Sequence, residues 1–396
     1  MKIVVAPDSY KGSLTAKEVG DNIEIGIRKV FPDAEITKIP MADGGEGTVQ
    51  SLADATGGKI IKANVKGPLF NDVEAFYGIL GDGKTAVIEM AAASGLPLVP
   101  EDKRNPLKTT TYGTGELIMH AINRGCRNFI IGIGGSATND GGEGMAKALG
   151  AKFEDKDGKD IGLGGGALGR LEKIDTSGMD KRLRECNFVA ACDVNNPLCG
   201  PDGASYVFGP QKGADDHMVK VLDSNLSNYA DIIKKDLKQD IKNVPGSGAA
   251  GGLGAGLLVF LNAKLKNGID IVIETTNLRE KIKGADLVIT GEGMIDFQTA
   301  FGKTPYGVAK TAKEKNIPVI AIAGGIGKDA RTLYDKGFDS IFSIVDKPMT
   351  LDEAIKNGSS YLQQTAERIM RVIKIGSYFT MPHNTRTSIS TPANSL

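Results

Sequence analysis

Short apolar runs alternate with helical patterns at both ends of the chain. Residues 3–6 form the first apolar run, and a polar loop over 7–13 follows it. Residues 15–30 then place Val19, Ile23, Ile27 and Val30 at the spacing of an amphipathic helix. The pattern predicts further strands over 35–39, 286–290, 318–323 and 340–345, and helices over 305–314 and 351–373. This alternation is typical of a parallel sheet covered on both faces by helices.

The middle of the chain has a different rhythm. Two runs, 73–79 and 85–90, read as paired strands around a Gly-Asp-Gly turn at 81–83. A buried strand over 129–133, a glycine-rich loop and a helix over 145–149 come next. A long helix is predicted over 217–241, whereas residues 162–184 show no clear period.

These patterns favour an α/β protein of two domains with a discontinuous first domain. Residues 1–69 and 283–376 would form a Rossmann-like domain with a parallel sheet, built from both chain ends. Residues 70–282 would form an inserted second α/β domain, with the active site in the cleft between the two. Residues 377–396, rich in Ser, Thr, Pro and Asn, are predicted to be a flexible tail. Two domains in series, divided near residue 150, are the alternative.

The loops after the predicted strands share one composition: glycine, a carboxylate, and Ser, Thr or Lys. Such loops occur at 8–13, 43–48, 134–144, 192–197, 246–252 and 291–304. Glycine lets backbone N–H groups approach a phosphate, carboxylates can hold Mg²⁺ or accept a proton, and lysine neutralises phosphate charge. Together these are the components of phosphoryl transfer, although any one of these loops is also typical of an ordinary turn.

Known nucleotide motifs do not account for these loops. Gly246-x-Gly248-x-x-Gly251 has the dinucleotide spacing, but Pro245 and a helical stretch precede it instead of a strand. It opens an apolar helix, predicted over 253–265, so it could still hold a phosphate. Gly302-Lys303-Thr304 has Phe297 where a P-loop needs its first glycine, and no His-Arg-Asp loop is present. A cation such as Lys303 is disfavoured at the start of a helix unless an anion binds there.

Composition narrows the function further. The chain of 396 residues carries 48 basic and 48 acidic residues, which argues against a nucleic-acid or anionic-membrane binder. No run of 18 apolar residues and no signal peptide is present, so a cytoplasmic protein is expected. Four cysteines lack zinc spacing and are predicted to be reduced thiols. Three scattered histidines leave acid–base chemistry to Asp or Glu.

The glycine-rich segments, in this order, resemble those of the bacterial type-1 glycerate kinases over about residues 1–375. The matching segments are Ala6-Pro7-Asp8-Ser9-Tyr10-Lys11-Gly12-Ser13, Met41-Ala42-Asp43-Gly44-Gly45-Glu46-Gly47-Thr48, residues 132–142, residues 192–198, and Thr290-Gly291-Glu292-Gly293 through Asp296 to Gly302-Lys303. The resemblance implies ATP-dependent phosphorylation of D-glycerate to a phosphoglycerate, with Mg²⁺. Met294 departs from the family, in which many members have Arg after Gly-Glu-Gly.

For this reaction the sequence offers specific candidates. Asp193 is the first choice to accept the proton of the glycerate hydroxyl, and Asp296 is the second. Lys11 and Lys303 would neutralise phosphate or bind the carboxylate. The other candidates are Asp8 and Ser13 for substrate, Asp43 and Glu46 for Mg²⁺, and Gly134, Gly135, Ser136 and Gly248 for the phosphates of ATP. The expected partners are glycerate and ATP only, and the chain would be a monomer or homodimer.

Two other functions remain compatible with the sequence. One is a different small-molecule kinase acting on a hydroxy acid or sugar acid, since residues 245–256 are similar to the phosphate loop of the galactokinase–homoserine kinase class. The other is a non-catalytic sensor that binds a nucleotide or sugar acid. A sensor would need the glycine-rich loops but not the repeated carboxylate–lysine pairs.

Overall fold

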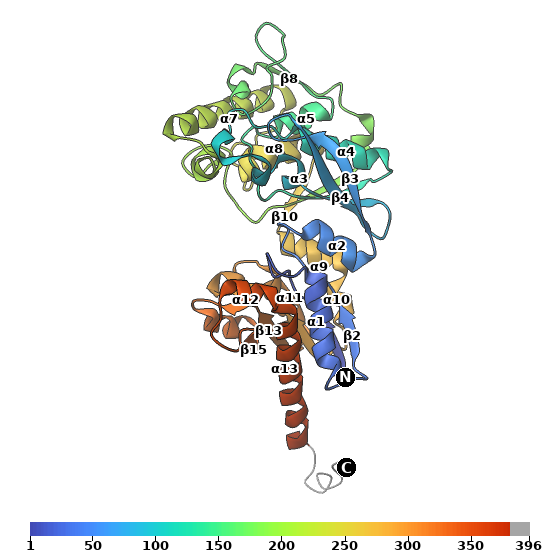
Figure 1. Ribbon diagram of the computed structural model, residues 1–396. Coiled ribbons are helices and arrows are strands. Elements are labelled where there is room, and N and C mark those ends of the chain that lie inside the picture. The colour runs from blue at the N-terminus through green and yellow to red at the C-terminus, as the bar shows by residue number, and fades with distance from the viewer. Residues whose placement is uncertain (381–396) are drawn as a thin grey trace. The chain divides into compact units, whose positions relative to one another are not determined.

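The chain folds into two compact units, each with its own parallel strands. The computed structural model describes residues 1–380, with side chains through residue 376. Unit 1 comprises residues 1–40 and the described residues from 278 onward, and unit 2 comprises residues 41–277 (Figure 1). The mixed α/β class with parallel sheets, predicted from the sequence, is confirmed.

Unit 1 is built on five parallel strands. They are β1 (Lys2–Val5), β2 (Glu35–Lys38), β11 (Leu287–Thr290), β13 (Val319–Ala323) and β15 (Ser340–Ser343). Their order across the sheet is β15-β13-β11-β1-β2, and every neighbouring pair is parallel. The chain therefore adds strands in one direction from β1 to β2 and in the other from β11 to β15. Such a sheet has a topological switch point between β1 and β11.

The first helix of unit 1, α1 (Ala16–Arg28), begins at a capping box. Thr15 accepts a hydrogen bond from the backbone N–H of Glu18, whose side chain in turn accepts from the N–H of Thr15. Val19 and Ile23 are fully buried on the apolar face of α1. That face belongs to the same core as Ala366 of α13 (Gly358–Thr380), which packs beside α1 (Figure 1).

The single helix predicted over 351–373 is wrong. The structure has two helices here, α12 (Leu351–Lys356) and α13, separated at Asn357. Asn and Gly are weak helix formers, so the Asn357-Gly358 pair permits the break although the apolar spacing continues through it. The end of α13 takes in residues 377–380, which the composition of the chain end predicts to be part of a flexible tail. The rest of that predicted tail, 381–396, lies outside the described residues.

Unit 2 has a six-stranded mixed sheet. Its strands are β3 (Lys59–Lys66), β4 (Asp72–Ile79), β5 (Thr85–Glu89), β6 (Asn128–Gly132), β9 (Asn187–Ala191) and β10 (Lys264–Lys266), in the order β10-β9-β6-β5-β4-β3. The pairs β5–β6, β6–β9 and β9–β10 are parallel, and β4 is antiparallel to both β3 and β5. The predicted strands over 73–79, 85–90 and 129–133 are confirmed within one residue at each end.

Residues 41–69 group with unit 2, whereas the strand–helix rhythm predicts the first boundary near residue 70. The reason is β3, which pairs with β4 along its whole length, from Lys59 opposite Ile79 to Lys66 opposite Asp72. Two adjacent isoleucines, Ile60 and Ile61, are followed by Lys62 and Asn64, so β3 has no regular apolar alternation that would reveal it as a strand. The alternative division near residue 150 falls inside unit 2.

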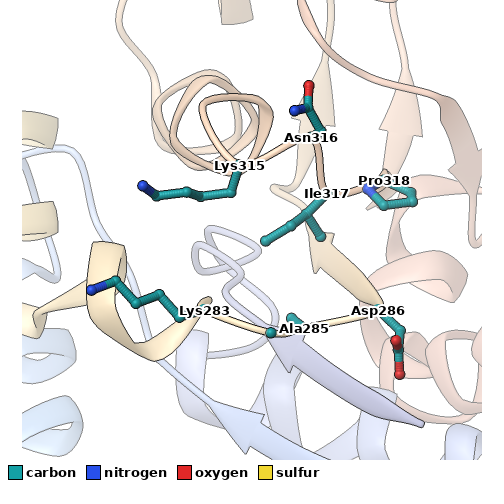
Figure 2. A pocket seen from close by; sticks show the side chains of 8 residues that line it. Lys283, Ala285, Asp286, Lys315, Asn316, Ile317 and Pro318 are labelled. Carbon is teal, nitrogen blue, oxygen red and sulfur yellow. The ribbon is translucent and has the colours of Figure 1, made fainter.

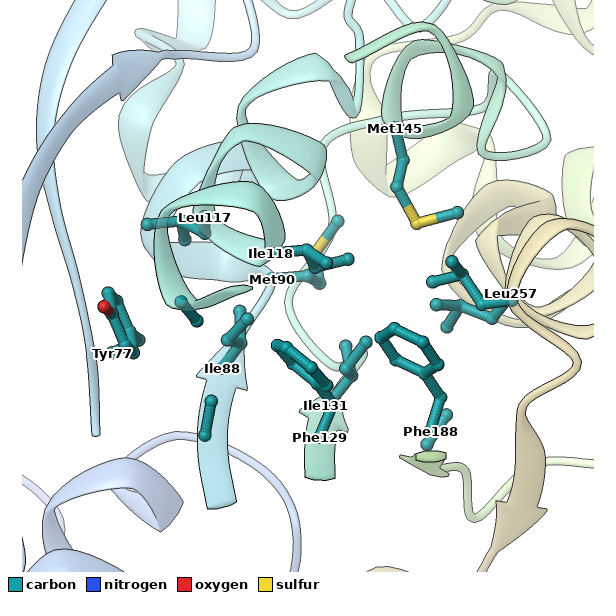
Figure 3. Packing of buried hydrophobic residues seen from close by; sticks show 14 of the residues in the cluster. Tyr77, Ile88, Met90, Leu117, Ile118, Phe129, Ile131, Met145, Phe188 and Leu257 are labelled. Carbon is teal, nitrogen blue, oxygen red and sulfur yellow. The ribbon is translucent and has the colours of Figure 1, made fainter. Parts of the chain in front are cut away.

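The helices of unit 2 pack on its sheet and around a second apolar core beside it. They are α2 (Thr48–Thr56), α3 (Ala91–Ser94), α4 (Tyr112–Asn123), α5 (Glu143–Ala148), α6 (Ala204–Phe208), α7 (Asp216–Leu237), α8 (Ala249–Leu261) and α9 (Gly268–Thr276). Phe129 of β6 and Phe188 of β9 stack at 4.7 Å between ring centroids, beside Met145 of α5 and Leu257 of α8 (Figure 3). Burying each such side chain stabilises the unit by roughly 1.5–3 kcal/mol.

The predicted helix over 253–265 is wrong at its C-terminal end. Helix α8 ends at Leu261, Asn262 adopts a left-handed conformation with φ 49°, and residues 264–266 form β10. Asparagine is one of the few residues that tolerates this conformation, which accounts for the abrupt end. Among residues 1–380, no helix is both long and apolar enough to span a bilayer.

Candidate active site

The predicted residues of unit 1 gather at the switch point of its sheet. Asp8 follows β1 and the loop from Gly291 follows β11, the two strands on either side of that point. The loops that follow strand ends at a switch point form the usual ligand site of an open α/β sheet. Here the backbone N–H of Asp8 donates to the carbonyl of Gly291 (2.8 Å), so the two loops are joined at their start.

Asp8 and Lys303 meet at the start of α11 (Thr304–Lys313). The carboxylate of Asp8 accepts a 2.6 Å hydrogen bond from the hydroxyl of Thr304 and another from the backbone N–H of Ser9. Lys303 is the N-cap residue of α11, and its Nζ lies 3.6 Å from a carboxylate oxygen of Glu292. Asp8 thus fixes the helix terminus, while Lys303 stays partly exposed beside it.

Lys11 lies on the same edge of unit 1 and is exposed. A Cβ on Gly293 would lie 3.5 Å from the backbone nitrogen of Lys11, so the loop after β11 runs past this residue. Tyr10 beside it is buried and donates to the carbonyl of Ile322. Burial, with a smaller contribution from Glu292, raises the pKa of Tyr10 far above its usual value, so its hydroxyl is a fixed donor and not an acid.

Two other predicted residues of unit 1 have structural partners. The hydroxyl of Ser13 donates to the carbonyl of Ile355 in α12 (3.0 Å). Asp296 is the N-cap of a short 3-10 helix, η6 (Phe297–Ala300), and its carboxylate accepts from the backbone N–H of Gln298 (2.8 Å). Each of these polar side chains therefore has a hydrogen bond to the backbone, of α12 for Ser13 and of η6 for Asp296.

In unit 2, the loop over residues 43–47 lies against the carboxyl end of β9 and the start of α9. A Cβ on Gly44, whose φ is 91°, would meet Cβ of Ala191 at 2.7 Å and Cα of Gly268 at 2.8 Å. A Cβ on Gly268 would come within 1.8 Å of the carbonyl oxygen of Asp43. Only glycine fits at both positions, so the glycines of this loop serve close packing of the backbone. This packing brings Asp43 to the end of β9, where Asp193 lies.

Asp193 has an oriented carboxylate in an acidic environment. Its Oδ1 accepts a hydrogen bond from the backbone N–H of Gly268 at the start of α9 (2.9 Å). Partial desolvation raises the pKa of Asp193, and the negative charges of Asp43 and Asp270 raise it further, against the lowering effect of the Gly268 hydrogen bond. Its proton affinity is therefore higher than that of an ordinary aspartate.

Asp43 and Glu46 carry oxygen ligands toward solvent. Oδ1 of Asp43 accepts from the backbone N–H of Gly45 (3.0 Å), and Glu46 is exposed. Among the described residues, no three His, Cys, Asp or Glu side chains are grouped closely enough to hold a metal ion by themselves. Mg²⁺ commonly takes one or two carboxylates and completes its shell with water and substrate phosphates, so the donor set at Asp43 fits that ion.

The predicted phosphate loop follows β6. Gly134 and Gly135 are exposed, Ser136 is buried, and no heavy atom lies within 4 Å of a Cβ built on Gly134. Gly248 is different: its N–H donates to the carbonyl of Asn196 (3.0 Å), and a Cβ there would lie 2.0 Å from the carbonyl oxygen of Pro197. Packing accounts for Gly248, whereas no packing contact of that kind requires glycine at position 134.

A surface hollow of about 560 Å³ lies at the other end of the strands of unit 1, beside the amino ends of β11 and β13 (Figure 2). Lys283, Asp286, Lys315 and Pro318 are among the residues that line it, and they precede β11 and β13. None of the predicted site residues contributes to this hollow. The hollow and the loops that carry the predicted residues of unit 1 therefore lie at opposite ends of the strands.

Two acidic residues beside the predicted ones are absent from the candidates that the sequence suggests. Glu292 interacts with Lys303 and accepts from the hydroxyl of Thr299 (2.7 Å), and Glu89 accepts from the backbone N–H of Val49 (2.8 Å). Both follow or end a strand, Glu292 after β11 and Glu89 in β5. A search for every carboxylate at a strand's carboxyl end would have found them, whereas glycine-rich composition points only to the loops themselves.

Comparison with known proteins shows a family match that includes all of these loops. A family profile described as the glycerate kinase family matches residues 3–374. The chain belongs to the glycerate kinase family. A glycerate kinase of Bacillus subtilis is 56% identical over 375 residues, which cover 95% of this chain and 98% of the relative. A glycerate 2-kinase of Escherichia coli is 55% identical over 376 residues, covering 95% and 99%.

A crystal structure of a related protein has the same fold as this chain. It is a crystal structure of a Salmonella typhimurium LT2 protein described as a glycerate kinase 2. The two superpose with a TM-score of 0.89 at 53% sequence identity, over 96% of this chain and 99% of that one. Glycerate kinases are phosphotransferases with an alcohol acceptor, and this chain is an enzyme of that class.

Proposed function

We propose that this enzyme transfers the γ-phosphoryl group of ATP to the 2-hydroxyl of D-glycerate, with Mg²⁺. The observation that carries the proposal is the family match over residues 3–374, with identities of 55–56% to glycerate kinases across nearly the whole chain. The Escherichia coli relative is named a glycerate 2-kinase, which supports the 2-position. Phosphoryl transfer depends mainly on positioning and charge neutralisation, and the loops of both units supply groups for both tasks.

Unit 1 would bind anionic groups. Lys303 at the N-terminus of α11 combines a cation with the positive end of a helix, an arrangement that is stable only opposite negative charge. The carboxylate of Glu292, 3.6 Å from Nζ of Lys303, neutralises part of this positive charge. A bound phosphate or carboxylate would neutralise the rest. Lys11 is exposed on the same edge and would take part in the same neutralisation. Asp8 acts on this site through Thr304, as a positioning residue.

Asp193 is our candidate for the residue that accepts the proton of the glycerate hydroxyl. The hydrogen bond from Gly268 fixes its Oδ1, which leaves Oδ2 to receive the proton. The raised pKa of Asp193 makes it a better proton acceptor than an ordinary aspartate. Asp296 is assigned the capping of η6, because it is the N-cap of that helix and its carboxylate accepts from the backbone of the first turn.

Asp43 and Glu46 are the candidates to hold Mg²⁺, and Gly134, Gly135 and Ser136 are those for the ATP phosphates. A bound Mg²⁺ would supply neutralisation of charge on the phosphate oxygens. Asp43 and Glu46 would hold the positive charge of the ion beside Asp193. The carboxylates of Asp43 and Asp193 are close enough for their charges to interact. Gly134 and Gly135 are both exposed, so their N–H groups could approach phosphate oxygens.

The proposal is tested by ADP release from the purified protein with Mg-ATP and a panel of acceptors. We expect release that depends on D-glycerate, with much slower release for L-glycerate, other hydroxy acids and sugar acids. Preference for another acceptor would replace glycerate as the substrate. Binding of ATP and glycerate with no ADP release above the buffer rate would identify a sensor and overturn the proposal.

A further inference from the structure

Helix α2 begins without a capping side chain of its own. Its N-cap residue, Gly47, has φ 88° and makes no side-chain hydrogen bond, and no acidic residue lies in its first turn. The first N–H groups of a helix have no partner within the helix and must be satisfied from elsewhere. This terminus matters for the site because the loop over 43–47, with Asp43 and Glu46, leads directly into it.

Glu89, the last residue of β5, supplies the missing acceptor. Its Oε1 accepts from the backbone N–H of Val49 (2.8 Å), and the N–H groups of Gly47 and Thr48 also interact with the carboxylate. Glu89 is only 9% exposed. Burial raises the pKa of Glu89 and the nearby charge of Glu46 adds to this, while the three backbone contacts oppose it. A carboxylate from a distant strand thus holds the end of the loop next to Glu46.

The other end of the loop is held by packing. Gly44 lies against Ala191 and Gly268, and its carbonyl oxygen would be 2.8 Å from a Cβ on Gly132 of β6. Glu89 pairs with Gly132 in the β5–β6 register, and its Cγ lies 3.7 Å from the same Cβ position. The loop is therefore fixed at Gly44 by backbone packing and at Gly47–Val49 by Glu89.

We propose that Glu89 is a positioning residue that holds Asp43 and Glu46 in the arrangement that binds the metal ion. This inference rests on the proposed function, which assigns those two residues to Mg²⁺. Glu89 would not touch the metal itself. It would act through the backbone of Gly47, Thr48 and Val49, as residues behind a ligand commonly do.

A carboxylate elsewhere in unit 2 provides a matched control. Glu116 of α4 accepts from the backbone N–H of Lys66 through its Oε2 (2.6 Å). This contact also joins a carboxylate to the backbone of another element, but it involves no residue of the loop. Glu116→Gln and Glu89→Gln therefore remove the same kind of charge–backbone interaction, and only the second is expected to affect the metal.

The experiment titrates Mn²⁺ into the full-length protein with ADP present and follows free Mn²⁺ by electron paramagnetic resonance. Unfolding temperatures are measured in parallel, so that binding is compared where every variant is folded. We expect Glu89→Gln to raise the Kd for Mn²⁺ about 10-fold or more, the usual effect of losing a group that orients metal ligands. The KM for Mg²⁺ should rise in step, with kcat at saturating Mg²⁺ close to that of the unaltered enzyme. Glu116→Gln should lower the unfolding temperature and leave the Kd unchanged.

Two further variants keep the outcomes separate. Glu89→Asp retains the charge on a shorter side chain, so it should recover part of the affinity for Mn²⁺. This variant replaces Glu89→Gln in the comparison if Glu89→Gln does not fold. Asp43→Asn removes a candidate ligand directly. If Asp43→Asn weakens Mn²⁺ binding while both Glu89 variants bind normally, the positioning role is overturned and the proposed function stands. If Asp43→Asn also binds normally, the metal assignment in the proposed function fails, and the role of Glu89 fails with it.

Discussion

Asp193 and Asp296 show how neighbouring contacts separate two aspartates that look alike in the sequence. Both lie in glycine-containing loops that follow strands. The Oδ1 of Asp296 accepts from Gln298, two residues further along the same loop, whereas the Oδ1 of Asp193 accepts from Gly268 of α9. Partial desolvation and the charges of Asp43 and Asp270 also raise the pKa of Asp193. The difference depends on Gly268, Asp43 and Asp270, which lie far from Asp193 in the sequence and near it in the fold.

Asp193→Asn should therefore abolish most turnover, while Asp296→Asn should not. An amide cannot accept the hydroxyl proton, so we expect kcat to fall by about 10²-fold or more, the range in which general bases act. Asparagine caps helices about as well as aspartate, so Asp296→Asn should keep kcat within about twofold. Steady-state kinetics with D-glycerate and Mg-ATP measure both. The reverse ranking would exchange the two roles.

The pH dependence follows from the same residue. As the proposed proton acceptor, Asp193 would act in its deprotonated form. Its pKa lies above the usual value, so activity should fall with decreasing pH at a higher pH than an ordinary aspartate of pKa about 3.9 would cause. A profile of kcat/KM against pH measures this, with stability checked at each pH. A profile that stays flat down to about pH 4 would remove Asp193 from this role.

Among the helices and strands, the sequence predicts those that bear regular apolar spacing. Strands β1, β4, β5, β6 and β11 appear within a residue or two of their predicted limits. The errors occur where a local feature competes with the spacing. Asn357-Gly358 divides a helix, Asn262 ends another, and in β3 Lys62 and Asn64 interrupt the apolar residues.

Glycine-rich loops divide into two kinds that the sequence cannot separate. At Gly44, Gly248 and Gly268 the absent side chain makes room for the protein's own backbone, whereas Gly134 faces open space. Both kinds produce the same pattern of glycine after a strand. The sequence therefore identifies the loops as a group but not which glycines are open to a ligand.

Gly268→Ala should destabilise unit 2. The added methyl would lie 1.8 Å from the carbonyl oxygen of Asp43, so the loop must move. Forcing atoms into a packed site costs about 1–3 kcal/mol, and the loss should appear in the free energy of unfolding from denaturant titration. Stability equal to that of the unaltered protein would refute the close packing of Gly268 against the Asp43 loop.

Gly134→Ala should have the opposite profile. Nothing lies within 4 Å of the new methyl, so the free energy of unfolding should stay within about 0.5 kcal/mol. If phosphates of ATP approach this backbone, the methyl will obstruct them and raise the KM for ATP several-fold. Kinetics at varied ATP and calorimetric binding of ATP measure the effect. Normal ATP affinity would remove Gly134 from the phosphate site.

Across the whole molecule, strand–helix rhythm indicates that distant parts of the chain build one sheet, and β1 and β2 do lie beside β11, β13 and β15. That rhythm does not locate the first boundary, because residues 41–69 join unit 2 through β3, a strand that the apolar pattern does not reveal. Each unit presents its own set of polar groups at strand ends: Lys11 and Lys303 in unit 1, and Asp43 and Asp193 in unit 2.

In the proposed reaction the phosphoryl group must pass to an alcohol oxygen of glycerate and not to water. Phosphorus-31 NMR of the products from D-glycerate and Mg-ATP distinguishes the two acceptors. We expect a phosphate ester in amounts equal to the ADP formed, with its phosphorus signal split into a doublet by the single proton on carbon 2. Inorganic phosphate as the only new signal besides ADP, or ADP formation independent of D-glycerate, would show that the enzyme is not a glycerate kinase of this kind.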